Sequence, residues 1–191
     1  MNEQLKHLIS IDVETTGLDP ERHSIISIGA VNFLNTEQFE SENLLRHGAE
    51  IDGYALTING ESEFLLRSRD NMLYYTEYEC LLNLIAFCDK TNSFTIIGKN
   101  PNFDRNFLLS IWKRQGRLEK EFPFTYRVIN WADMAIPFML RGGYQIPDGG
   151  ISSDAFSAYL GLEEEIKPHI AINGANHNKR CVHGILAKYG L

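Results

Sequence analysis

Cysteine is scarce in this sequence and follows no pattern. Cys80, Cys88 and Cys181 are an odd number, lie far apart and form no Cys-x-x-Cys pair. This spacing excludes a disulfide framework and argues against a structural zinc site. We therefore expect three reduced thiols in a chain that folds around an ordinary hydrophobic core.

Long apolar runs and an excess of basic residues are also absent. No uninterrupted apolar stretch approaches the roughly 20 residues that a membrane-spanning helix needs, and the first residues lack the basic and apolar regions of a secretory signal. These absences predict a cytoplasmic protein without a membrane partner. The net charge of −7 argues against a protein that coats nucleic acid through a general positive field. It does not exclude an enzyme that acts on nucleic acid.

The remaining pattern is that of one α/β domain over residues 1–191. Apolar runs typical of strands occur at 8–13, 25–33, 38–45, 94–98 and 126–130, and helical periodicity follows Thr76 and recurs at 102–115, 131–140, 153–160 and 173–189. The first three strands are close enough to form an antiparallel meander. Residues 51–69 show no period and are expected to be an irregular insertion over the sheet. Strands first and alternating elements later predict a mixed sheet.

Asp12 and Glu14 fall in a run that is otherwise typical of a buried strand. Residues two apart on a strand project from the same face, so the acids point together while Ile9, Ile11 and Val13 fill the opposite face. Neighbouring buried carboxylates repel unless a cation lies between them. Oxygen ligands without a nearby cysteine favour Mg²⁺ or Mn²⁺. The alternative is a strand end whose acids are solvated or paired with a basic side chain.

Two later clusters supply further candidate residues. The strand over 94–98 breaks at Gly98 and leads into an amphipathic helix with Asp104 in its first turn, where an acid also complements the helix dipole. His169 follows Pro168 on a loop before the last helix, where a histidine is either solvated or able to enter a site. The acidic run 163–165 is expected to be a solvated face.

Together the three clusters resemble the DEDDh branch of the DEDD 3'-5' exonucleases, whose ribonuclease H-like fold is shared by proofreading exonuclease subunits, oligoribonucleases and ribonuclease T. The family motif Asp-x-Glu-Thr-Thr-Gly-Leu is matched from Asp12 to Leu18. The motif Asn-x-x-Phe-Asp-x-x-Phe-Leu is met by Asn100, Phe103, Asp104, Phe107 and Leu108. The resemblance implies an α/β fold with a mixed ribonuclease H-like sheet, three antiparallel first strands and helices on both faces.

The resemblance also implies a two-metal hydrolysis of DNA or RNA. Asp12, Glu14 and Asp104 would hold two ions, Mg²⁺ or Mn²⁺, about 4 Å apart around the attacking and leaving oxygens of a terminal phosphodiester. His169 would accept the proton of the attacking water, and nucleoside 5'-monophosphates would leave from the 3' end. The substrate contacts carried over from the family fall on Thr15, Thr16, Gly17, Leu18, Asn100 and Phe103.

The third family motif, His-x-Ala-x-x-Asp, is incomplete. His169 and Ala171 match it, but Gly174 occupies the position of the final aspartate. In the family that aspartate helps to hold one of the two metals, and glycine has no side chain with which to do so. The sequence therefore predicts a reduced or abolished activity in this chain, and a faster reaction after Gly174→Asp.

Two other functions are compatible with these residues. An inactive exonuclease-fold module would bind nucleic-acid ends or a protein partner; Gly174 favours it, and the retained Asp12, Glu14, Asp104 and His169 argue against it. A phosphatase or nucleotidase would use the same metals on small substrates. The expected partner is single-stranded or 3'-terminal nucleic acid. The choice between DNA and RNA, a homodimer and a polymerase-type partner are left open.

Overall fold

Five strands form one mixed sheet in the computed structural model, which describes residues 3–91, 94–148 and 150–190. The strand order is β3-β2-β1-β4-β5. The first three strands pair antiparallel, whereas β4 and β5 continue the sheet in parallel with β1. The strands are β1 Leu8–Thr15, β2 Ile25–Asn32, β3 Gln38–Glu42, β4 Thr95–Gly98 and β5 Ile129–Asn130. The predicted fold class and the antiparallel meander are confirmed.

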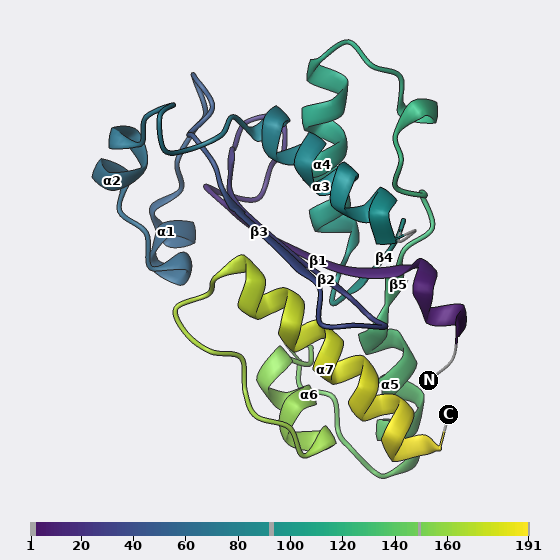
Figure 1. The fold of residues 1–191 in the computed structure, drawn as a ribbon. Coiled ribbons are helices and arrows are strands. Elements are labelled where there is room, and N and C mark those ends of the chain that lie inside the picture. Colours follow the sequence, from purple (N-terminus) through teal and green to yellow (C-terminus); the bar gives the residue numbers. More distant parts are fainter. Residues whose placement is uncertain (1–2, 92–93, 149, 191) are drawn as a thin grey trace.

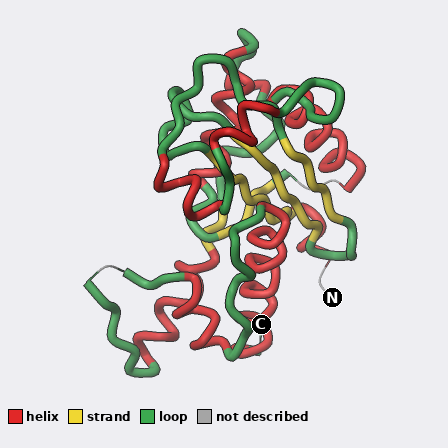
Figure 2. Tube along the Cα trace, turned by 90° about the vertical axis from the view of Figure 1, so that its left-hand side faces the viewer, coloured by secondary structure: helices red, strands yellow, loops and turns green. Residues whose placement is uncertain are grey.

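Helices cover both faces of this sheet (Figure 1). Helices α3 and α4 lie on one face and α5, α6 and α7 on the other, and the view turned by 90° shows the strands between these two groups (Figure 2). The helices are α1 Gly53–Asn59, α2 Glu63–Ser68, α3 Glu77–Thr91, α4 Asn102–Arg114, α5 Trp131–Arg141, α6 Ser153–Leu160 and α7 Ala171–Tyr189, with short 3-10 turns at Glu3–His7 and Glu119–Glu121.

Strand alternation divides the apolar side chains between two cores. Ile9 and Ile11 of β1 pack with Leu81 of α3 and Phe107 of α4 on one face. On the other face the largest buried side chain is Trp131, which belongs to a cluster with Phe33, Ile97, Phe156, Val182 and Ile185. The acids of β1 project toward this second layer, opposite the isoleucines, as the period of two predicts.

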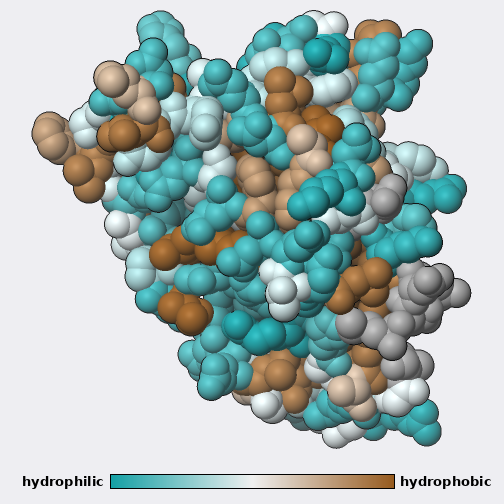
Figure 3. Space-filling view, in the orientation of Figure 1, coloured by the Kyte–Doolittle hydropathy of each residue, from teal (hydrophilic) through white to brown (hydrophobic). Residues whose placement is uncertain are grey.

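The segment 51–69 differs from its prediction, because it contains the helices α1 and α2. Asp52 caps α1 by accepting a hydrogen bond from the Tyr54 N–H at 2.8 Å, and Gly60 ends it in the left-handed conformation with φ 70°. Helices of seven and six residues make only two turns each, which is too short for a clear period. Phe64 and Leu65 of α2 are exposed, and hydrophobic side chains gather at the upper left of Figure 3, where α1 and α2 lie in the same orientation.

No helix in the described ranges is both long and apolar enough to cross a membrane.

Helix α7 approaches the sheet closely because two positions carry no side chain. Gly29 of β2 is the register partner of Asp12 on β1 and shares its face. A Cβ at Gly29 would overlap the backbone of Ala171 and Ile172 at the start of α7. The helix therefore rests directly on the strand beside Asp12, and the loop that carries His169 is brought to the same place.

We expect Gly29→Ala to disrupt this contact. The added methyl group meets helix backbone, which cannot rotate away as a side chain can, so the free energy of unfolding should fall by about 1–3 kcal/mol. Chemical denaturation followed by circular dichroism measures the change. Gly53→Ala is the matched control, because a Cβ at Gly53 would have nothing within 4 Å. Equal stability of the two variants would show that α7 is not seated as described.

Candidate active site

A cavity of about 240 Å³ opens where β1 and β4 end beneath the start of α7. Open sheets tend to place their sites beyond the carboxyl ends of parallel strands. Six of the residues predicted from the sequence line this cavity: Asp12, Glu14, Asn100, Phe103, Asp104 and His169. The walls also contain Lys99, Ser153, Glu165, Gly174, His177 and Asn178. Side chains from three distant segments are thus brought to one place.

Asp104 is tied to β1 by a hydrogen bond. Its Oδ1 accepts the N–H of Val13 at 3.0 Å, between the two acids of the strand. Strand β4 pairs with β1 only from Leu8 to Ser10, so the N–H of Val13 lies beyond the ladder and needs another acceptor. Capping of its own helix therefore does not account for the position of Asp104. This contact places its carboxyl group beside Asp12 and Glu14.

All three carboxyl groups have pKa values above their ordinary range. Burial is the largest cause for each of them. The pKa of Asp104 rises to about 8, with a contribution from Glu14 that the Val13 hydrogen bond opposes. The pKa of Glu14 rises to about 7, although His169 acts in the opposite direction. The pKa of Asp12 rises well above its ordinary value, through burial and then through Asp104, Glu14 and Glu165.

The prediction that residues 163–165 form a solvated face is wrong for Glu165. Only 10% of its side chain is exposed, and its Oε1 lies 3.1 Å from Nδ1 of His169. Glu163 and Glu164 are exposed as expected. The composition of the acidic run concealed this difference, because only the course of the loop turns Glu165 inward. Its spacing of four residues from His169 was the available signal.

Lys99 is a second site residue that sequence reasoning missed. Its Nζ lies 3.3 Å from Oγ of Ser153, and burial lowers its pKa. Its backbone N–H donates to Oδ1 of Asn178 on α7 at 3.2 Å. Lys99 therefore places a positive charge in the wall of the acidic cavity. Its place directly after the strand that ends at Gly98 could have identified it.

His177 also lines the cavity but already has partners. Its Nε2 lies 3.2 Å from Oγ of Ser157 and 3.4 Å from Sγ of Cys181. The residue is only 2% exposed. His169 is therefore the histidine with a ring open to the cavity and to solvent, with 31% of its side chain exposed.

The four residues from Thr15 to Leu18 do not line this cavity. Thr15 and Thr16 are buried, and their hydroxyl groups donate to the carbonyl oxygens of Gly17 and Glu50, both at 2.7 Å. Gly17 must lack a side chain, because a Cβ there would overlap the ring of His23. Leu18 is 78% exposed at the surface.

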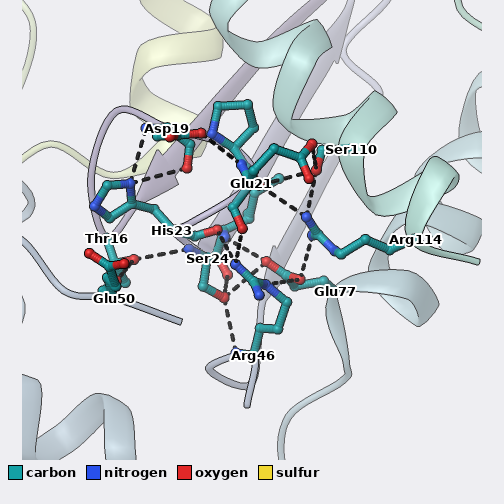
Figure 4. Close-up of polar contacts among 12 residues, drawn as sticks. Thr16, Asp19, Glu21, His23, Ser24, Arg46, Glu50, Glu77, Ser110 and Arg114 are labelled. Carbon is teal, nitrogen blue, oxygen red and sulfur yellow. Dashed lines mark hydrogen bonds and ion pairs between the residues drawn. The ribbon is translucent and has the colours of Figure 1, made fainter. Parts of the chain in front are cut away.

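A buried glutamate, Glu77, holds the start of β2 next to this segment (Figure 4). Oε1 of Glu77 accepts hydrogen bonds from Oγ of Ser24 at 2.9 Å and from the N–H of Ile25 at 2.8 Å. Its Oε2 pairs with Arg114 at 3.0 Å and with Arg46 at 3.7 Å. Glu77 is 7% exposed, so this network anchors the connection between β1 and β2 through a satisfied buried charge.

Gly174 lies directly against Asp12. A Cβ at position 174 would overlap Oδ2 of Asp12 and lie 3.0 Å from its Oδ1. The carboxyl end of Asp12 thus occupies the space into which a side chain at 174 would project. An aspartate at 174 would require Asp12 to rotate, which is feasible because the contacting atoms are at the end of a short side chain.

The chemistry of these groups fits a hard divalent cation. None of the ion pairs formed within the described part of the chain involves Asp12, Glu14 or Asp104. The described residues also contain no group of three or more His, Cys, Asp or Glu side chains that is already placed to ligate one ion. Water and substrate oxygens would have to complete the coordination, which is usual for Mg²⁺.

Comparison with known proteins agrees with this geometry. Residues 9–67 match the family described as Exonuclease. The oligoribonuclease of Vibrio cholerae is 30% identical over 137 residues, covering 63% of this chain and 70% of that protein. The DNA polymerase III PolC-type of Thermotoga petrophila is 30% identical over 117 residues, and the chain spans only 8% of its length. The chain belongs to the exonuclease family that includes these oligoribonucleases.

Solved structures of exonucleases have the same fold. The nuclease domain of a DEDDh family member bound to rAMP has a TM-score of 0.70 and 18% identity, over 100% of this chain and 96% of that one. Exonuclease I of E. coli in complex with a dA16 oligonucleotide has a TM-score of 0.71 and 15% identity, over 95% of this chain and 40% of that one. These likenesses confirm the predicted ribonuclease H-like fold.

The raised pKa values predict how the stability of the metal-free protein depends on pH. Carboxyl groups whose pKa is about 7 to 8 in the folded state and about 4 in the unfolded state favour folding only while protonated. Their contribution is complete below about pH 4 and is lost as the pH rises through 7 and 8. We therefore expect the free energy of unfolding in EDTA to fall between about pH 4 and about pH 8. Each pKa unit corresponds to about 1.4 kcal/mol.

Asp104→Asn isolates this effect from other titrating groups. The amide oxygen can still accept the Val13 N–H, but the side chain no longer ionises. Urea unfolding in EDTA at pH 5, 6.5 and 8 should show a shallower pH dependence for the variant than for the unchanged protein. If the free energy of unfolding changed with pH equally in the variant and in the unchanged protein, the burial of Asp104 in the acidic cavity would be contradicted.

Proposed function

We propose that this chain is a single-domain, metal-dependent 3'-5' exonuclease that hydrolyses the terminal phosphodiester bond of DNA or RNA and releases nucleoside 5'-monophosphates. The observation that carries the proposal is the convergence of Asp12, Glu14, Asp104 and His169 in one cavity. The three acids lie close together in a buried place, and no structural role accounts for their mutual repulsion.

Asp12, Glu14 and Asp104 are the residues that would hold Mg²⁺ or Mn²⁺. Such ions supply positive charge for the attacking and leaving oxygens of a phosphodiester. His169 stands beside Glu14 with an exposed ring, where it can accept a proton from water. Lys99 lies in the same wall and offers a cation to a substrate phosphate. Phe103 is partly exposed at the start of α4 and provides an apolar surface for a sugar or base.

The relatives support two substrate classes. The similarity to oligoribonucleases supports RNA oligonucleotides as the substrate, whereas a structural neighbour in complex with a DNA oligonucleotide supports DNA. Both polymers present the same terminal phosphodiester, so they are tested side by side. Leu18, whose side chain is exposed, would contact the terminal nucleotide. The backbone before Leu18 would support that contact, because it is held in place by the contacts of Thr15, Thr16 and Gly17.

We expect a 5'-labelled single-stranded oligonucleotide to be shortened stepwise from its 3' end with Mn²⁺ and to stay intact in EDTA. Asp12→Asn removes one charge of the site and should slow shortening by more than about a hundredfold, because metal-assisted charge stabilisation is worth several kcal/mol. Denaturing electrophoresis of time points measures the rate. Glu164→Ala, at an exposed position outside the cavity, is the control.

The outcomes separate the alternative functions. Binding without shortening, with or without metal, would overturn the proposal in favour of the inactive module that Gly174 suggests. Phosphate release from mononucleotides, with intact oligonucleotides, would favour a nucleotidase. A metal-dependent ladder that Asp12→Asn abolishes supports the exonuclease.

Gly174 is expected to limit the rate. In Gly174→Asp the new carboxylate adds a ligand oxygen once Asp12 rotates, and Mg²⁺-dependent turnover should rise by about tenfold or more, equivalent to about 1.4 kcal/mol of transition-state free energy. Gly174→Ala causes the same overlap with Asp12 but supplies no oxygen, so its turnover should not rise. The initial rate at saturating Mg²⁺ measures both. An unchanged rate in Gly174→Asp would show that position 174 is not that of the missing aspartate.

A further inference from the structure

Glu165 stands apart from the two glutamates that precede it. The three residues are identical in chemistry, yet Glu163 and Glu164 are exposed and the side chain of Glu165 is only 10% exposed. The segment between α6 and α7 contains no helix that would impose this orientation. A carboxylate loses hydration when it is buried, and it stays buried only where a partner compensates the loss.

The surroundings of Glu165 make its inward position more costly. It lines the cavity that already contains Asp12 and Glu14. Burial is the main reason for the raised pKa of each of these two groups, and the charge of Glu165 raises both further. Solvent is accessible from the same loop, so repulsion alone would favour an outward side chain. A specific contact must hold Glu165 in place.

That contact is the hydrogen bond to His169. Oε1 of Glu165 lies 3.1 Å from Nδ1 of the imidazole. A carboxylate can only accept, so Nδ1 is the donor, and in the neutral ring the lone pair is then on Nε2. The backbone of His169 is held separately, because its N–H donates to the carbonyl of Ile58 in α1 at 3.5 Å. The backbone contact places the residue, whereas the hydrogen bond with Glu165 acts on the ring.

We propose that Glu165 is a positioning residue for His169, which orients the imidazole and selects the tautomer whose Nε2 faces the cavity as a proton acceptor. The proposal rests on the exonuclease function, because the rate of hydrolysis is where positioning has its effect. Carboxylates that orient a histidine through Nδ1 serve the same purpose in other hydrolytic sites.

Three variants test the proposal kinetically. Glu165→Ala removes the acceptor and should lower kcat by about 10- to 100-fold, as the loss of carboxylates that orient histidines at metal sites does. KM should stay within about twofold, since Glu165 need not touch the substrate. Glu165→Gln keeps an oxygen that can accept from Nδ1 and should recover much of the loss. Glu164→Ala, one residue away and exposed, should leave kcat and KM unchanged.

The tautomer of His169 gives a readout that does not depend on turnover. Long-range ¹H–¹⁵N correlation spectra, assigned with His169→Gln, should show a protonated Nδ1 in the unchanged protein and in Glu165→Gln, but not in Glu165→Ala. A protonated Nε2 in the unchanged protein, or a kcat of Glu165→Ala equal to that of Glu164→Ala, would overturn the proposal. If the unchanged protein shortens no oligonucleotide, the exonuclease function fails, and the spectra still decide whether Glu165 sets the tautomer.

Discussion

The close seating of α7 on the acidic face of β1 is the constraint on which the site depends. Gly29 and Gly174 provide no side chain at the two points where the helix, the strand and Asp12 meet. A larger residue at position 29 would push α7 away from the strand, together with the loop that brings His169 and Glu165 to the cavity. The small side chains of Ala171 and Ala175 are buried on the same helix. The fold thus uses missing side chains to bring charged ones together.

Electrostatic repulsion opposes this arrangement, and the rest of the molecule must offset it. Three carboxyl groups with raised pKa values favour the protonated state at the centre of the metal-free site. Two apolar clusters, one on each face of the sheet, supply the burial that keeps the strands together despite this repulsion. Glu77 shows the opposite solution to the same problem, since its charge is matched by two arginines and two hydrogen-bond donors. Within the described ranges, Asp12, Glu14 and Asp104 form no ion pair with an arginine or a lysine, and buried acids with raised pKa values are typical of functional sites.

Much of the fold could be predicted from short-range pattern. The apolar alternation of β1 and β2 and the helical period of α3, α4 and α7 agree with the structure to within a few residues. Helix α3 begins with a capping box, in which the Thr76 N–H donates to Oε2 of Glu79 and Oγ1 of Thr76 accepts from the Glu79 N–H. The predicted strand over 126–130 is reduced to two residues, and the helices α1 and α2 were missed. Short elements depend more on their neighbours than on their own period.

Local sequence is enough to show that Asp12 and Glu14 share one face of a strand, because the period of a strand needs no other part of the chain. It also placed Asp104 at the start of a helix and His169 just before another. Three other relations arise from packing: Asp104 accepts the N–H of Val13 in β1, Glu165 faces His169, and Gly174 lies against Asp12. These relations join segments whose separation is set by loop paths and helix packing, and no local period encodes such distances.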